Sequence, residues 1–168
     1  MTLSIALSSL ALAFTFSQAS NANITNLTCS IRTSTGHYLK AVGGGGRTTD
    51  VLHSDAVRVD AWERFLLIAT TDVSHGEVHY GLRTHTGNYL TAMGSGGKTT
   101  DVIHSNASQL QDWEKFQLVS LGNNRYALRT KSGNYLTAVG GGGRTTDVVH
   151  TDATQIGAWE VFTLNCGN

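Results

Sequence analysis

Hydrophobic and polar residues alternate over short stretches of the chain, and turn-forming residues separate these stretches. Residues 126–130 (YALRT) alternate, residues 131–134 (KSGN) favour a turn, and residues 135–139 (YLTAV) predict the returning strand of a hairpin. Residues 145–150 (TTDVVH) are rich in β-branched side chains and predict a third strand. Residues 151–158 (TDATQIGA) predict a turn, and residues 159–164 (WEVFTL) predict a fourth, alternating strand. The pattern predicts an all-β domain.

This four-strand pattern occurs three times. The segments from Gly36 to Phe65, Gly87 to Phe116 and Gly133 to Phe162 align without gaps, and the first and third are identical at 21 of 30 positions. The repeats cover approximately residues 28–76, 77–124 and 125–168, with extra residues in 67–84. Twelve short strands in three similar units predict a β-trefoil, a six-stranded barrel capped by three hairpins. A four-bladed propeller would need a fourth repeat.

The N-terminal segment differs from the rest of the chain. Residues 1–22 carry no charged side chain and are mainly apolar, which is typical of a secretory signal peptide, and the alternative is a buried N-terminal helix. The apolar run falls short of the roughly 20 residues that a membrane-spanning helix needs. We therefore expect a secreted protein with one domain, residues 23–168, and no membrane insertion.

Two further features fit an extracellular location. Asn23, Asn26 and Asn106 each begin a sequon for N-linked glycosylation. The chain has two cysteines, Cys29 and Cys166, one at each end of the predicted domain. In an oxidising compartment such a pair predicts a disulfide, and the alternative is two free buried thiols.

Charge and composition narrow the choice of partner. The chain has 12 basic and 12 acidic residues, evenly spread, and its formal net charge is zero. Nucleic acids and anionic membranes attract basic patches, so neither is expected to be a partner. The sequence predicts no cofactor, and it leaves the oligomeric state open.

Many repeated residues are expected to serve the fold. One Trp, one Phe and one Leu per repeat are predicted to form the barrel core: Trp62, Trp113, Trp159, Phe65, Phe116, Phe162, Leu39, Leu90 and Leu136. Hairpin glycines that need a positive φ are predicted at Gly36, Gly87 and Gly133. The repeated Glu63, Glu114 and Glu160 are predicted to make structural hydrogen bonds.

Two family resemblances follow from these motifs. Residues 127–139 (ALRTKSGNYLTAV) and 158–162 (AWEVF) resemble the L-[RK]-T-x-x-G-x-Y-L and W-E-x-F signatures of fascin-like and hisactophilin-like β-trefoils, in all three repeats. The glycine turn followed by His-x-Asp also looks like the sugar sites of galactose-binding β-trefoil lectins of mussels. That likeness implies sugar contacts from His53, Asp55, His104, Asn106, His150 and Asp152, with the turn glycines Gly43, Gly44, Gly94, Gly140 and Gly141. The lectins' later His is replaced here by Val57, Ser108 or Thr154, so the likeness leaves the sugar open.

The segment from the glycines to the His changes less between repeats than its neighbour. The TTD triplet and the His recur in every copy, whereas the residues between the His-containing strand and the Trp have diverged. Either a demanding backbone geometry or a ligand must hold this segment constant. Asp50, Asp101 and Asp147 are further candidates for ligand contact, and the alternative is that they only fix the loop.

Other chemistries fit the segment less well. Residues 92–99 (AMGSGGKT) come close to a phosphate-binding loop, but no helix is predicted after them. One His per repeat is a weak signal for a metal site. Glycosidase catalysis needs two carboxylates, and Asn106 replaces one of them in the second repeat. We therefore expect no enzymatic activity.

Carbohydrate recognition suits these residue types best, because planar acceptors and donors bind pairs of adjacent hydroxyl groups. The sequence thus predicts a secreted lectin with up to three equivalent sugar sites, which cross-links glycans on cells or polysaccharides, with galactose-type sugars as candidates. The alternatives are a fascin-like structural or protein-binding module and a secreted hydrolase inhibitor.

Overall fold

The computed structural model describes residues 26–72 and 76–167, and within them the chain forms twelve strands. The first repeat contains β1 (Leu27–Arg32), β2 (Tyr38–Ala41), β3 (Leu52–Ala56) and β4 (Arg64–Asp72). The second contains β5 (Glu77–Arg83), β6 (Tyr89–Ala92), β7 (Ile103–Ala107) and β8 (Lys115–Ser120). The third contains β9 (Arg125–Arg129), β10 (Tyr135–Ala138), β11 (Val149–Ala153) and β12 (Phe162–Gly167). The predicted signal peptide and Asn23 lie outside the described residues.

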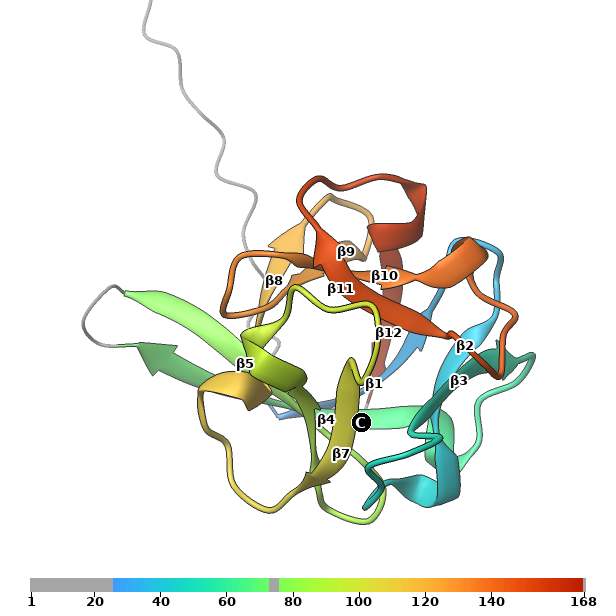
Figure 1. Ribbon diagram of the computed structural model, residues 1–168, viewed down its shortest axis with the longest axis horizontal. Helices are drawn as coiled ribbons and strands as arrows, with labels where there is room; N and C mark the ends of the chain where they lie inside the picture. Colours follow the sequence, from blue (N-terminus) through green and yellow to red (C-terminus); the bar gives the residue numbers. More distant parts are fainter. Residues whose placement is uncertain (1–25, 73–75, 168) are drawn as a thin grey trace, which may run out of the picture.

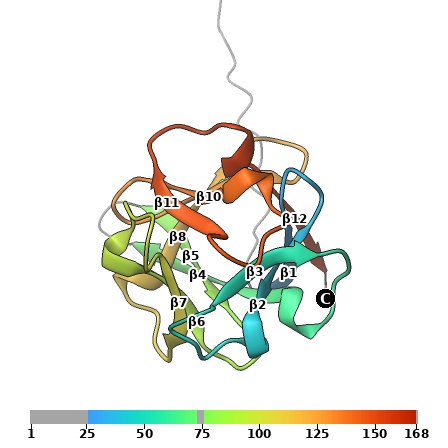
Figure 2. The ribbon, with the colours of Figure 1, turned by 45° about the vertical axis from the view of Figure 1, so that its right-hand side comes forward.

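Six of the strands close into a barrel. Antiparallel pairing runs from β1 to β4, β5, β8, β9 and β12, and β12 pairs with β1 again. The remaining strands form three hairpins, β2–β3, β6–β7 and β10–β11. Figure 2 shows these hairpins around a common centre. This topology confirms the predicted β-trefoil.

The extra residues of the first two repeats lengthen one hairpin. β4 and β5 have 9 and 7 residues, compared with 6 and 5 in the equivalent β8 and β9. The β4–β5 hairpin consequently projects beyond the rest of the barrel in Figure 1.

The interior contains most of the predicted core residues. Phe65, Phe116 and Phe162 are at most 1% exposed, and the three repeated leucines, Leu39, Leu90 and Leu136, are at most 3% exposed. The hairpin glycines have φ of 90–93°, as predicted for Gly36, Gly87 and Gly133.

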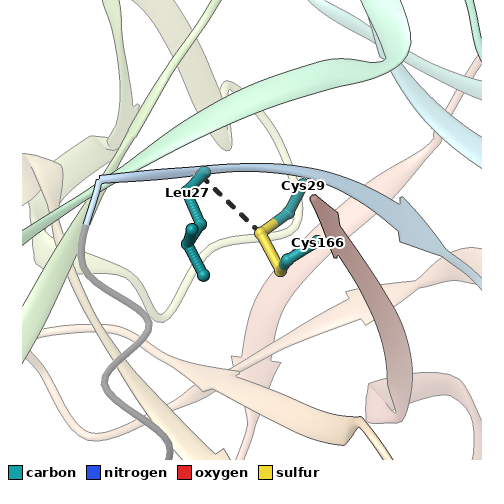
Figure 3. Close-up of a disulfide and its surroundings, with 3 residues drawn as sticks. All are labelled: Leu27, Cys29 and Cys166. Atoms are coloured by element: carbon teal, nitrogen blue, oxygen red, sulfur yellow. Dashed lines mark hydrogen bonds between the residues drawn. A yellow bond between two sulfur atoms is a disulfide. The ribbon is translucent and has the colours of Figure 1, made fainter. Parts of the chain in front are cut away.

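The predicted disulfide between Cys29 and Cys166 is confirmed, with a Cα–Cα distance of 4.0 Å. It joins the first and last strands, because Cys29 and Cys166 are paired across β1 and β12. The Sγ of Cys29 also lies 3.7 Å from the carbonyl oxygen of Leu27 (Figure 3). The bond thus closes the barrel where the two ends of the described chain meet.

The three tryptophans correct the sequence prediction. Trp62, Trp113 and Trp159 are 44%, 44% and 50% exposed, so they do not belong to the barrel core. Each lies in a short 3₁₀ turn, Ala61–Glu63, Asp112–Glu114 or Ala158–Glu160, and not in the predicted strand. The strand begins later, and in the third repeat its first residue is Phe162.

A buried carboxylate produces this turn. Glu63, Glu114 and Glu160 are 5–8% exposed, and each Oε2 accepts a hydrogen bond from the backbone N–H three residues earlier, at 2.7–3.0 Å. In the second and third repeats, Oε1 also accepts a hydrogen bond of 2.7 Å from Thr91 or Thr137. The predicted structural role of these glutamates is therefore confirmed, and the bonds hold the chain in a turn that directs the Trp outward.

The third strand of each repeat also begins later than predicted. The strands start at Leu52, Ile103 and Val149, and the TTD triplets before them form bends. The Asp of each triplet has a positive φ of 47–49°, which interrupts an extended strand. Conversely, Thr151, Asp152 and Ala153 belong to β11 and not to the predicted turn.

Candidate functional site

Each glycine run makes a turn that packs against the next repeat. In the first repeat the turn begins with the 3₁₀ segment Val42–Gly44, and a Cβ at Gly45 would overlap Thr84 Oγ1 in the second repeat. The carbonyl oxygen of Gly44 accepts hydrogen bonds from the N–H of Thr86, at 3.0 Å, and from its hydroxyl, at 3.1 Å. Gly96 with Thr130, and Gly142 with Thr33, repeat the close approach. The third position of each run, which is Gly45, Gly96 or Gly142, therefore serves inter-repeat packing, whereas Gly43, Gly94 and Gly140 approach only a basic side chain of their own repeat.

Backbone hydrogen bonds after each glycine run link the three repeats in a ring. Gly46 N–H donates to Ser105 O at 2.7 Å, and Ser105 N–H donates to Arg47 O at 2.8 Å. The second and third repeats make the same pair of bonds, at the same distances, through Gly97, Lys98 and Thr151 and through Gly143, Arg144 and Ser54. Each repeat thus binds the next, and the third binds the first. This ring gives a structural reason why the segment changes so little between repeats.

The His and the Asp of each repeated segment are hydrogen bonded to one another. Nε2 of His53 lies 2.7 Å from Oδ1 of Asp50, and the same distance separates His104 from Asp101 and His150 from Asp147. The Asp side chains are about half exposed (49–57%), whereas the His side chains are 18–25% exposed. A basic residue, Arg47, Lys98 or Arg144, lies 3.3–3.8 Å from the same Asp. Each carboxylate therefore orients one imidazole.

The predicted sugar contacts do not all lie together. The carboxylate bound to His53 is that of Asp50, whereas Asp55 pairs with Lys40, with 3.3 Å between Oδ1 and Nζ. In the part of the chain that the structure describes, the side chains of Asn106 and Asp152 are exposed and make no intramolecular hydrogen bond or ion pair. Sugar binding by any of these residues stays a prediction.

Two kinds of hollow lie near these residues. The TTDV segments of all three repeats line one of about 690 Å³ around the pseudo-threefold axis. At the periphery, Lys40, Asp55, Val57, Arg58 and Trp62 help to line a pocket of about 490 Å³. Trp113 and Lys115 lie in a pocket of about 650 Å³ in the second repeat.

Sequence reasoning missed Lys40 and the tryptophans as pocket residues. The Trp-Glu-x-Phe motif fits an alternating strand, and only the glutamate hydrogen bonds make it a turn. The sequence did contain a signal for Lys40, because the first repeat has a basic side chain where the other two have Thr91 and Thr137.

Other predicted features can be placed but not tested. Asn26 and Asn106 are exposed, and their glycosylation stays a prediction. Among residues 26–72 and 76–167, no group of three His, Cys, Asp or Glu side chains is arranged to hold a metal ion. No helix in the same residues is long and apolar enough to cross a membrane.

Comparison with known proteins supports the fold. No family model matches the chain, and no curated protein sequence matches it. Among solved structures, the designed threefold-symmetric protein ThreeFoil matches with a TM-score of 0.65 and 17% identity, over 82% of this chain and 96% of that one. The Rhizoctonia solani agglutinin matches with a TM-score of 0.67 and 11% identity, over 84% and 96%.

A third similar structure is the Polyporus squamosus lectin, bound to the epitope Neu5Acα2-6Galβ1-4GlcNAc. It matches with a TM-score of 0.63 and 14% identity, over 83% of this chain and 49% of that one. Identities this low are informative about the fold alone. The structural matches, together with the closed six-stranded barrel and its three hairpins, establish that the chain is a β-trefoil.

Proposed function

We propose that the chain is a secreted carbohydrate-binding lectin with up to three sugar sites and no catalytic activity. The observation that carries the proposal is a planar polar side chain at the same surface position in each repeat: Asp55, Asn106 and Asp152. Two of these side chains, Asn106 and Asp152, have no partner within the described structure. Intramolecular bonding therefore does not account for these two side chains, and sugar hydroxyls bind groups of this kind.

The His–Asp pairs support the same proposal. Each imidazole is held in one orientation by a carboxylate 2.7 Å away, so it reaches a ligand with little loss of rotamer freedom. Among the similar structures, one is an agglutinin by name and the P. squamosus lectin has a bound glycan epitope. Three sites around a pseudo-threefold axis face different directions, so the function would depend on cross-linking by many weak contacts.

Agglutination tests the proposal. A D55A/N106A/D152A variant removes the three planar side chains, and H53A/H104A/H150A removes the three imidazoles. Both should lose agglutination of cells or polysaccharide, because each sugar site loses hydrogen-bonding groups. H85A is the control, since His85 is exposed and lies outside the predicted contacts. Production in a bacterial periplasm allows the disulfide to form and leaves Asn106 unglycosylated.

A thermal-shift measurement separates binding from loss of fold. A sugar that binds only the folded state raises the melting temperature of the unmodified chain. Unchanged agglutination by both triple variants would contradict the proposed contacts. No thermal shift with any sugar, together with binding to a matrix protein or inhibition of a hydrolase, would favour the alternatives.

A further inference from the structure

The three exposed tryptophans are the only tryptophans of the chain, and there is one in each repeat. Each leaves 44–50% of its surface in water, while the Phe three residues later is at most 1% exposed. Large aromatic side chains contribute most to stability when they are buried. The three tryptophans lie outside the buried core cluster, so core packing does not explain their recurrence.

The glycine turns hold the tryptophans in place. A Cβ at Gly44 would lie 3.3 Å from Cδ1 and Nε1 of Trp62, and a Cβ at Gly141 would lie 3.5 Å from Cδ1 of Trp159. The buried carboxylate of the following Glu fixes the 3₁₀ turn that carries each Trp. The indoles of Trp62 and Trp159 are thus supported on one side by the backbone and partly open to solvent, which is a preorganised surface for a ligand.

The pocket beside Trp62 combines this surface with polar groups. Its volume of about 490 Å³ lies within the roughly 300–1,000 Å³ of small-molecule sites. Lys40 and Asp55 provide donors and acceptors, and Val57, 79% exposed, adds an apolar side chain. Flat apolar surface beside a few hydrogen-bonding groups matches a pyranose ring, which has C–H groups on one face and hydroxyls at its edge.

The charges in this pocket favour a neutral sugar. Lys40 pairs with Asp55 at 3.3 Å, and Arg58 pairs with Asp60 at 3.0 Å. The buried Glu63 adds a further carboxylate to the lining. With two basic and three acidic side chains, the pocket offers no unpaired cation to a uronic or sialic acid.

We infer that neutral pyranoses stack on the indole of Trp62, Trp113 or Trp159, one in each repeat. The inference rests on the proposed lectin function. The three surfaces are not equivalent. Lys40 and Asp55 of the first repeat are replaced by Thr91 and Asn106 in the second, and by Thr137 and Asp152 in the third. Only the first repeat can offer an ammonium group at this position, so its sugar affinity differs from that of the other two.

Indole NMR tests the inference without any mutation in the binding protein. Uniformly ¹⁵N-labelled chain gives three indole N–H signals, which W62F, W113F and W159F assign individually. Methyl β-galactopyranoside, methyl β-glucopyranoside and methyl α-mannopyranoside are the neutral probes, and glucuronic acid is the acidic one. We expect at least one neutral probe to shift the indole signals saturably, with a different midpoint for Trp62, and glucuronic acid to shift them less.

Matched variants provide the second measurement. W62A should weaken binding at the first repeat by about twofold to tenfold, the range of an aromatic contact. V78A is the control, because Val78 on β5 is also 44% exposed and lies away from the pocket residues. Melting temperatures of both variants show whether the fold survives.

The outcomes separate the inference from the proposed function. Glycan binding without indole shifts, and with full affinity in W62A, would overturn the inference and leave the lectin proposal standing. Absence of binding to any glycan would overturn both. Indole signals that move on dilution of the protein alone would identify the tryptophans as contacts between copies of the chain, and would also overturn the inference.

Discussion

Replacing Gly142 with alanine tests whether the glycine run recurs because neighbouring repeats require it. Gly142 has a φ of 110° and a ψ of −169°, a backbone region that is essentially restricted to glycine. A Cβ at this position would overlap Thr33 Oγ1, which belongs to the first repeat. The substitution therefore both strains the backbone and forces apart two repeats that are joined by hydrogen bonds of 2.7 and 2.8 Å.

The expected loss of stability combines the two effects. Backbone strain of this kind costs about 1–3 kcal/mol, and overfilling a packed site costs about 1–3 kcal/mol. We expect G142A to lower the free energy of unfolding by about 3–5 kcal/mol. In a domain of this size, each kcal/mol corresponds to about 2–4 °C, so the melting temperature should fall by about 10 °C.

Gly140 provides the matched control. It also has a positive φ, 67°, but the nearest atom to an added Cβ is Arg144 Nη1 at 3.8 Å. G140A should therefore cost only the left-handed strain, about 1 kcal/mol after the gain from a less flexible unfolded chain. Guanidinium denaturation followed by far-UV circular dichroism, with the disulfide intact, measures both variants. Equal losses for G140A and G142A would refute the inter-repeat packing argument.

Three further predictions use the same denaturation assay. S95G should raise the free energy of unfolding by about 0.5–1 kcal/mol, because Ser95 has a φ of 71° where the other repeats have glycine; a lower stability would contradict this. C29S/C166S should lower it by about 4–5 kcal/mol, since the disulfide spans 137 residues; a loss below 1 kcal/mol would show that strand pairing alone closes the barrel. T137V should cost about 1–3 kcal/mol by removing the 2.7 Å hydrogen bond to the buried Glu160, whereas T145V, at an exposed position, should be neutral.

Periodicity and repetition were sufficient to predict the architecture. Alternating strands in three units predicted a β-trefoil, and in this barrel the first and last strands pair, which brings Cys29 to Cys166. The phenylalanines were predicted as core because they are large, apolar and repeated in every unit, and they are buried. These inferences depend on local patterns or on the closure of the barrel, and both are visible in the sequence.

The orientation of the tryptophans was not predictable in the same way. Alternation placed Trp159 in a strand, whereas the Glu160 carboxylate binds the Gly157 N–H at 2.7 Å and turns the chain before the strand begins. The packing of the glycines was also hidden, because Gly45 meets Thr84 in the next repeat. Such contacts depend on how repeats meet, and a local pattern contains no information about that.

The sequence did not show which aspartate carboxylate binds each histidine. Both Asp50 and Asp55 lie within three residues of His53, and periodicity does not distinguish them. The positive φ of Asp50, 47°, places its carboxylate 2.7 Å from the imidazole. Asp55 lies in the pocket of Trp62, so the residues of one predicted site divide between the axial and the peripheral hollow.

A glycan array probed with the fluorescently labelled chain tests carbohydrate binding most directly. The account predicts binding to glycans that end in neutral pyranoses, competed by the corresponding free sugar and lost in the D55A/N106A/D152A variant. An array on which the folded, disulfide-bonded chain binds no glycan above background would contradict the lectin assignment.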